Sequence, residues 1–293
     1  MQSTSENFDY DYVIIGSGFG GSVSALRLSQ KGYKVLVVEK GKWFNNADDF
    51  PKTNWNLKKW LWIPGLRFFG IMKMTFLRHV TIVSGTGVGG GSLVYANTLP
   101  RPSRAFFDSG SWAGLLDWEG ELDAHYKEAL RMLGASPNPR LFDADKALKD
   151  LAVEIGKEKE FRHPNVAVYF GKPGREVADP YFGGEGPSRT GCVHCGGCMT
   201  GCRYNSKNTL DKNYLFFAQK LGADILAENE AVGVAPIHGG EGAEGYNISL
   251  KSSTKLFGGR REVRAKGVIF SGGVLGTVKL LLKLKSTTLP NLS

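Results

Sequence analysis

The N-terminal part of the chain alternates between short apolar runs and a polar, glycine-rich segment. Residues 12–15 (YVII) and 34–39 (KVLVVE) have the continuous apolar character of buried strands. Between them, residues 22–31 carry apolar positions at helical spacing, and Gly32 ends that helix. A strand, a glycine turn, a helix and a second strand in so short a span predict a parallel β–α–β unit.

The rest of the pattern predicts more short elements of both kinds and no internal repeat. The expected strands cover residues 80–83, 224–227, 246–250 and 263–270, and the expected helices cover residues 122–133, 145–155, 210–221 and 274–285. Residues 42–80 are aromatic-rich and irregular. The pattern therefore predicts an α/β fold with a Rossmann-like β–α–β unit at its N-terminal end.

The first glycine loop has a binding motif in the right context. Gly16, Gly18 and Gly21 form a G-x-G-x-x-G motif directly between the first expected strand and its helix. The three glycines allow the turn, the close approach of a diphosphate and the packing of helix on strand. Glu39 ends the second strand, where a carboxylate accepts hydrogen bonds from the adenosine ribose. A plain glycine turn is the alternative, and the loop alone does not separate FAD from NAD.

A second glycine-rich run, residues 85–97 (GTGVGGGSLVYAN), follows the next expected strand. Such a run indicates backbone pressed against a flat or phosphorylated ligand, and a tightly packed turn is the alternative. Together with the N-terminal unit, it resembles the glucose–methanol–choline (GMC) family of FAD-dependent alcohol oxidoreductases. Within that family, the sequence is most similar to the bacterial branch that oxidises cholesterol.

The resemblance extends over essentially the whole chain. Residues 231–232 look like the segment whose valine backbone binds adenine, residues 268–277 look like the returning strand and helix of the FAD domain, and residues 288–292 look like the stretch after that helix. Asn97 falls where the family brings a polar group near the reactive flavin edge. The cofactor-binding residues indicated by the motifs and the resemblance are Gly16, Gly18, Gly20, Gly21, Glu39, Lys40, Gly85, Gly87, Val88, Gly90, Gly91, Ser92, Asn97, Val232, Gly272 and Gly273.

The resemblance also implies a division of the chain. Residues 1–100 are expected to form the first part of the FAD-binding domain, and residues 101–190 an inserted helical and loop region on the substrate side. Residues 191–233 would hold a Cys-rich loop and the return to the FAD domain, and residues 234–293 a β-hairpin with the returning strand and helix. The C-terminal catalytic domain is expected to be missing. None of the five histidines occupies the family's catalytic motif, so no catalytic residue is assigned.

The activity implied by the resemblance is FAD-dependent oxidation of an alcohol, with hydride transfer to flavin N5. A sterol such as cholesterol, or another hydrophobic alcohol, is the expected substrate, and dioxygen or a redox partner the expected electron acceptor. Three alternatives remain open. They are a flavin and iron–sulfur electron-transfer subunit without its own substrate chemistry, a truncated non-catalytic product, and an NAD-binding enzyme.

All four cysteines lie in one short run, at Cys192, Cys195, Cys198 and Cys202. This is the spacing of ligands in bacterial ferredoxins, although Arg203 replaces the usual proline. Clustered cysteines in a cytosolic protein favour a metal over a disulfide. A [4Fe–4S] cluster, a structural zinc ion, and reduced thiols or a local disulfide are the three interpretations.

The aromatic segment at residues 44–76 allows two interpretations. It is either a loop that packs in the core over the flavin domain, or a lip at a membrane surface through which a lipid alcohol enters. In the second interpretation Trp60 and Trp62, with the basic residues near them, would contact the bilayer. Farther along, Lys207 is expected to be a solvated lysine, with a phosphate contact as the alternative.

Composition excludes several classes of protein. The 293 residues are 42% hydrophobic, with 17 Phe, which predicts an ordered domain with a substantial core. The net charge of +9 is spread along the chain without a basic block, so nucleic-acid binding is not expected. The polar, acidic N-terminus does not resemble a secretory signal, and no stretch reaches the ~20 apolar residues of a membrane span. A cytoplasmic location is therefore expected.

Overall fold

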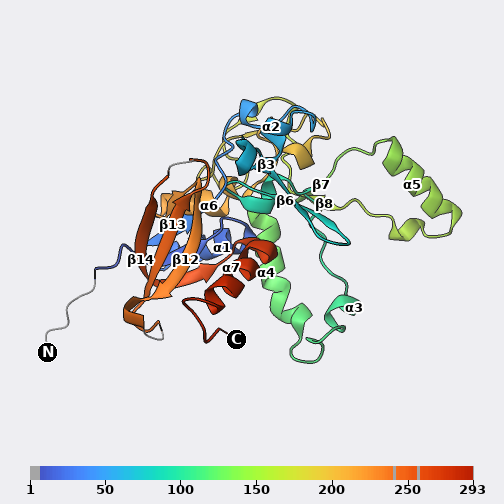
Figure 1. Cartoon of the computed structure of the whole chain (residues 1–293). Helices are drawn as coiled ribbons and strands as arrows, with labels where there is room; N and C mark the ends of the chain where they lie inside the picture. Colours follow the sequence, from blue (N-terminus) through green and yellow to red (C-terminus); the bar gives the residue numbers. More distant parts are fainter. Residues whose placement is uncertain (1–6, 240–241, 256–257, 293) are drawn as a thin grey trace. The chain divides into compact units, whose positions relative to one another are not determined.

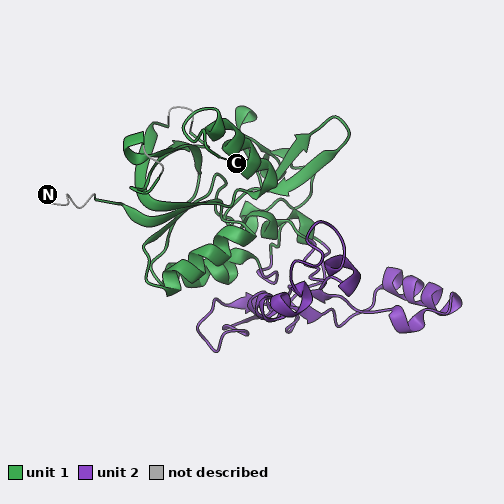
Figure 2. Cartoon of the chain, turned by 90° about the horizontal axis from the view of Figure 1, so that it is seen from below, with its two compact units in different colours: residues 1–95, 197–203, 209–293 green, residues 96–196, 204–208 purple. Residues whose placement is uncertain are grey.

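The computed structural model describes residues 7–239, 242–255 and 258–292, and the chain forms two compact units (Figure 2). Unit 1 comprises residues 1–95, 197–203 and 209–293. Unit 2 comprises residues 96–196 and 204–208. Each unit therefore draws on segments that are distant in the sequence, and each is described by itself below.

A six-stranded sheet forms the centre of unit 1, with the strand order β11-β2-β1-β14-β13-β12 (Figure 1). The strands are β1 (Tyr10–Ile15), β2 (Val35–Val38), β11 (Asp224–Leu226), β12 (Asn229–Pro236), β13 (Tyr246–Ser252) and β14 (Arg260–Phe270). Strands β11, β2, β1 and β14 pair in parallel, whereas β14, β13 and β12 pair antiparallel. The prediction of an α/β, Rossmann-like fold is confirmed.

Three helices accompany this sheet: α1 (Phe19–Gln30), α6 (Tyr214–Lys220) and α7 (Gly273–Lys285). Helix α1 connects β1 to the parallel strand β2, as the sequence predicts. One core cluster includes Val13 of β1, Leu36 of β2, Ile248 of β13 and Leu284 of α7, all fully or almost fully buried. Burying each such side chain contributes about 1.5–3 kcal/mol. The apolar runs at the strands therefore fix the position of the loops between them.

A group of shorter elements lies between β2 and the second glycine loop. They are α2 (Leu57–Trp60), β3 (Trp62–Ile63), β4 (Phe68–Phe69), β5 (Met72–Phe76) and β6 (Thr81–Gly85). Strands β3 and β4 pair antiparallel, and so do β5 and β6. The sequence analysis expected an irregular segment here and did not predict strand β5. Its side chains are mostly half-buried, so it leaves no continuous apolar run in the sequence.

The aromatic residues of this segment divide between core and surface. Trp62 is 7% exposed and its ring lies 5.7 Å from that of Phe69. Trp60 packs against a second core cluster that includes Phe44 and Ile71. The burial of Trp62 and the partial burial of Trp60 favour the core interpretation for these two residues. Trp55, in contrast, is 88% exposed.

Unit 2 is a smaller assembly of short elements. It contains α3 (Arg104–Phe107), α4 (Trp118–Met132), α5 (Asp143–Glu154), β7 (Ser136–Pro137), β8 (Asn165–Val166), β9 (Glu176–Val177) and β10 (Arg189–Thr190). The buried Arg189 guanidinium donates to Asn205 Oδ1 at 2.8 Å and to the carbonyl oxygen of Lys207 at 2.8 Å. Lys207 is itself buried, so the expectation of a solvated lysine is wrong.

Two local expectations differ from the structure. The helix expected at residues 210–221 begins only at Tyr214, because Asn213 takes a non-helical backbone (φ −142°, ψ −94°) and its side chain accepts a hydrogen bond from Tyr214 N. Val232 lies within β12, a strand that is absent from the strands expected from the sequence. Over the three described stretches of the chain, no helix is both long and apolar enough to cross a bilayer.

Candidate cofactor-binding site

The first glycine loop joins the end of β1 to the start of α1. Gly16 has φ +105°, and a Cβ there would lie 2.5 Å from the carbonyl oxygen of Ser271, so only glycine fits. Gly18 is the N-cap of α1 with extended backbone (φ −69°, ψ −166°). A Cβ on Gly18 would meet no described atom within 4 Å. The loop thus has open space at the helix N-terminus, where a diphosphate binds in such motifs.

Gly21 has a different role from Gly18. A Cβ at Gly21 would lie 1.9 Å from the carbonyl oxygen of Gly16 and 3.2 Å from Ile14 Cγ2. The missing side chain therefore lets α1 pack directly on β1. At Gly20, a Cβ would approach only the hydroxyl oxygen of Ser271, at 3.0 Å. The motif predicts these separate roles, and the structure places the glycines accordingly.

The second glycine loop lies against the first, backbone to backbone. Gly90 has φ +54°, and a Cβ there would be 2.8 Å from Gly18 Cα. A Cβ on Gly85 would be 2.4 Å from the carbonyl oxygen of Gly90. Gly91, like Gly18, has no described atom within 4 Å of its Cβ position. The two loops therefore form one glycine-lined surface with two open positions.

Gly87 and Val88 of the second loop pack against residues 41–44. Gly87 has φ +147°, and its Cβ position is 2.7 Å from the ring of Phe44. Val88 is buried, and its N–H donates to the carbonyl oxygen of Lys42 at 3.1 Å. A Cβ on Gly41, just after β2, would be 2.2 Å from Gly87 N. The loop is thus packed against the chain that follows β2.

Glu39, at the end of β2, is 6% exposed. Its Oε2 accepts hydrogen bonds from Ser17 N at 3.1 Å and from Ser17 Oγ at 2.8 Å. Its Oε1 accepts from Gly41 N at 2.8 Å. A carboxylate has about four acceptor positions, so it retains capacity for a ribose hydroxyl. The sequence reasoning missed Ser17, whose only signal is its position between Gly16 and Gly18.

Lys73 of β5 lies near Lys40, which follows the end of β2. The carbonyl oxygen of Lys40 accepts a hydrogen bond from Ser253. Burial, and then the neighbouring Lys40 ammonium, lowers the pKa of Lys73 from its usual value, while Glu230 opposes that shift.

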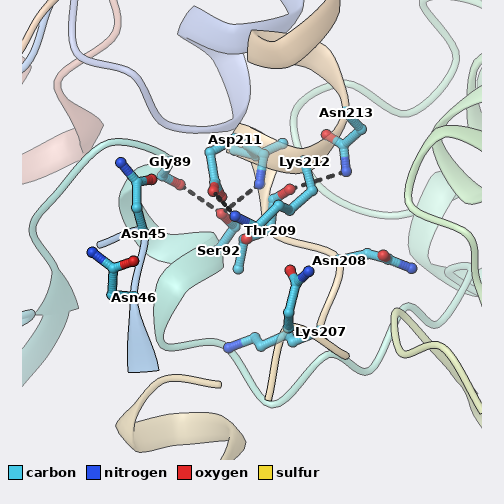
Figure 3. Close-up of polar contacts among 12 residues, drawn as sticks. Asn45, Asn46, Gly89, Ser92, Lys207, Asn208, Thr209, Asp211, Lys212 and Asn213 are labelled. Carbon is cyan, nitrogen blue, oxygen red and sulfur yellow. Dashed lines mark hydrogen bonds and ion pairs between the residues drawn. The ribbon is translucent and has the colours of Figure 1, made fainter. Parts of the chain in front are cut away.

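Ser92 connects the second loop to a more distant turn (Figure 3). Its buried hydroxyl donates to the carbonyl oxygen of Gly89 at 2.7 Å and accepts from Leu210 N at 3.0 Å. Asp211, the next residue, forms an ion pair with Lys212 at 2.8 Å. The hydroxyl of Ser92 therefore has protein partners in both roles, and its contribution to the site is to position the loop.

Val232 occupies a β-bulge. The pairing of β12 with β13 shifts register between Ala231 and Gly233, so Val232 is the extra residue. A bulge leaves the backbone of the extra residue outside the ladder, and bulges recur beside functional sites. The carbonyl oxygen of Val232 accepts from Lys283 Nζ at 2.7 Å.

Two further cofactor-binding candidates lie where β14 meets α7. Gly272 is the N-cap of α7, and its N–H donates to Thr277 Oγ1 at 3.0 Å. Gly273 has φ +68° and no described atom near its Cβ position. Both glycines are exposed at the start of a helix, the part of a helix that offers N–H donors to anions.

Asn97 belongs to unit 2. It is 3% exposed with φ +66°, and its carbonyl oxygen accepts from Ala167 N at 3.0 Å. Within the described residues its side-chain Oδ1 has no hydrogen-bond partner. A buried amide oxygen without a partner costs about 1–3 kcal/mol, and a bound ligand can relieve this cost.

These features together fit a dinucleotide. The open positions at Gly18 and Gly91 leave room for a diphosphate against backbone N–H groups, and Glu39 can accept from a ribose. The residues present therefore suit FAD.

The cysteine run is not arranged as a metal site. Cys195 is exposed and the other three are partly buried, and Cys192 Sγ accepts from His194 N at 3.3 Å. In the part of the chain that the structure describes, no three or more His, Cys, Asp or Glu side chains are placed to hold one metal ion. A Cβ on Gly201 would lie 2.1 Å from the Phe50 ring, so this glycine serves packing. The iron–sulfur and zinc interpretations gain no support.

Comparison with known proteins gives a consistent result. The sequence model of the GMC oxidoreductase family matches residues 10–286. Cholesterol oxidase of Acinetobacter baumannii is 49% identical over 99% of this chain and 53% of its own length. Cholesterol oxidase of Mycobacterium tuberculosis is 46% identical over 97% of this chain and 50% of its own length. The chain thus spans about half the length of these relatives.

The similarity to solved structures concerns the fold alone. A fungal aryl-alcohol oxidase matches 92% of this chain and 46% of its own, with a TM-score of 0.50 and 18% identity. Pyridoxine 4-oxidase from Mesorbium loti matches 91% of this chain and 50% of its own, with a TM-score of 0.50 and 17% identity.

Proposed function

The chain belongs to the GMC oxidoreductase family, and on that premise we propose that it is the FAD-binding part of an enzyme that oxidises a sterol or a similar hydrophobic alcohol. The resemblance deduced from the glycine loops is thereby confirmed at the level of the family. Support for the substrate comes from the two cholesterol oxidases, at 49% and 46% identity. Because these relatives are oxidases, dioxygen is the proposed electron acceptor.

The open position at Gly18 is the observation that carries the proposal. The two glycine loops hold their backbones in contact and leave space at the N-terminus of α1. When bound, FAD supplies the group that accepts a hydride from the alcohol carbon. The protein's own contribution is to hold the diphosphate against backbone N–H groups and to accept the ribose hydroxyl at Glu39.

A fusion protein tests both cofactor and substrate. We expect residues 1–293, joined to the remaining C-terminal part of the Acinetobacter baumannii cholesterol oxidase, to purify with the absorption bands of bound flavin. Adding cholesterol in detergent without oxygen should bleach those bands, because reduced flavin loses its visible absorption. The matched control is the fusion with Gly18→Ala, which should lack the flavin bands.

Three outcomes would contradict the proposal in different ways. A colourless fusion with affinity for nicotinamide nucleotides would support the NAD-binding alternative. Bound flavin that a small alcohol bleaches but cholesterol does not would refute the sterol. A broad shoulder in the visible absorption spectrum, together with iron in the sample, would support the electron-transfer alternative. Iron content is therefore measured on the same material.

We further propose that the tip of the β5–β6 hairpin contacts a membrane surface from which a sterol is taken. The turn is closed by a hydrogen bond from Leu77 N to the carbonyl oxygen of Val80 at 2.9 Å. Phe76, Leu77 and Val80 are 72%, 51% and 53% exposed. Arg78 and His79 lie between them, and this mixture of large apolar and basic side chains suits an anionic interface.

Liposome flotation tests this contact. Replacing Phe76 and Leu77 together with serine should reduce flotation with phosphatidylserine vesicles by about tenfold or more, because each buried apolar side chain contributes about 1.5–3 kcal/mol. The control replaces Val274 and Val278 with serine, two exposed residues on α7. Equal flotation of the two double variants would refute the hairpin contact.

A further inference from the structure

Ser17 occupies an unusual position between the two glycine loops. It is fully buried, although it lies in a loop. Its Oγ is 2.8 Å from Glu39 Oε2, 3.1 Å from Gly89 N and 3.4 Å from the carbonyl oxygen of Gly87. One hydroxyl group of the first loop therefore contacts both the carboxylate at the end of β2 and the second loop.

The direction of these hydrogen bonds follows from the partners. The backbone N–H of Gly89 can only donate, so the Ser17 oxygen is the acceptor of that bond. The hydroxyl has a single proton, and Glu39 Oε2 is closer than the carbonyl of Gly87. The bonds therefore run in one direction, from Gly89 N–H to the hydroxyl and from the hydroxyl to the carboxylate.

Gly89 is held on both sides. Its N–H donates to Ser17, and its carbonyl oxygen accepts from the hydroxyl of Ser92 at 2.7 Å. Its φ of +102° requires glycine, and a glycine backbone has more conformational freedom than that of other residues. Two buried serine hydroxyls thus fix the conformation of the second loop, and only Ser17 also contacts Glu39.

We propose that Ser17 is a positioning residue that couples the ribose-binding carboxylate of Glu39 to the second glycine loop. This inference rests on the proposed function, since it concerns FAD binding. The hydroxyl orients Glu39 Oε2, which also accepts from Ser17 N at 3.1 Å, and it holds Gly89 of the second loop by accepting from Gly89 N at 3.1 Å. Removing the hydroxyl releases both groups at once.

The test measures FAD affinity of the 293-residue chain by quenching of flavin fluorescence. Ser17→Ala should raise the dissociation constant about 10- to 100-fold, since two buried hydrogen bonds are lost. Ser22→Ala is the matched control, because Ser22 is equally buried but its hydroxyl donates to Phe19 O within α1 at 3.0 Å. Ser17→Cys replaces the hydroxyl with a larger thiol that is only a weak hydrogen-bonding group, and it should lose affinity as Ser17→Ala does.

A double-mutant cycle with Glu39→Gln separates positioning from a general effect on stability. If the hydroxyl acts through the carboxylate, the combined loss of affinity is smaller than the product of the two single losses. A combined loss equal to that product would refute the coupling, and so would unchanged FAD affinity in both Ser17 variants. If the wild type and Ser22→Ala both fail to bind FAD, the proposed function itself is wrong, and the inference is overturned with it.

Discussion

Gly18→Ala should remove FAD binding from the chain without unfolding it. The added Cβ meets no described atom within 4 Å and the backbone at Gly18 is extended, so the folded protein accommodates alanine. The methyl group instead occupies the space where a diphosphate approaches the N-terminus of α1. We expect the dissociation constant for FAD to rise at least about 100-fold, because several charge-assisted hydrogen bonds are weakened together.

The free energy of unfolding should change by less than about 1 kcal/mol in the absence of FAD. Alanine is a poorer N-cap than glycine, but it also reduces the entropy of the unfolded chain, and the two effects oppose each other. The control is Gly65→Ala, which adds a methyl group to another open position in unit 1. Gly65→Ala should retain FAD, and equal loss of FAD in both variants would contradict this account of Gly18.

The parallel part of the fold could be predicted because buried parallel strands are continuous apolar runs. Residues 12–15 and 34–39 have that character, and the structure places β1 and β2 there. Strand β12 was not expected, because its sequence NEAVGVAP contains a glycine and a proline and its side chains are mostly half-buried. Local pattern is informative where burial is complete and fails where it is partial.

For the candidate site, too, the sequence predicts some of the residues and misses others. The glycines follow a rule about spacing, so the motif indicates Gly16, Gly18 and Gly21 directly. Ser17 occupies one of the positions that the motif leaves undefined. Its partner Gly89 is 72 residues away in the sequence, and their contact arises only when the two loops meet. Spacing alone could not have found it.

The cysteine run illustrates the opposite error. Its spacing is that of a ligand set, yet spacing does not say which way the side chains point once the loop packs. In the described structure, Gly201 of this run lies against the ring of Phe50, in the second core cluster of unit 1. The requirement for glycine there comes from packing.

Gly21→Ala should have the largest effect on stability of any substitution in the first loop. Its Cβ would lie 1.9 Å from the carbonyl oxygen of Gly16 and 3.1 Å from the carbonyl carbon, and both are backbone atoms that cannot rotate away. Helix α1 would have to move off β1, at the centre of the sheet. We expect a loss of about 4 kcal/mol or more in the free energy of unfolding, or no soluble protein, together with loss of FAD.

Gly20→Ala is the matched control for Gly21→Ala, one residue earlier in the same helix. There the Cβ approaches only the Ser271 hydroxyl oxygen, at 3.0 Å, and a side chain can rotate. Urea unfolding followed by circular dichroism, without FAD, should show a change of about 1 kcal/mol or less for Gly20→Ala. If Gly21→Ala proved as stable as Gly20→Ala, the close packing of α1 on β1 would not be what the third glycine of the motif provides. Gly18 and Gly21 then could not be assigned separate roles, one in binding and one in folding.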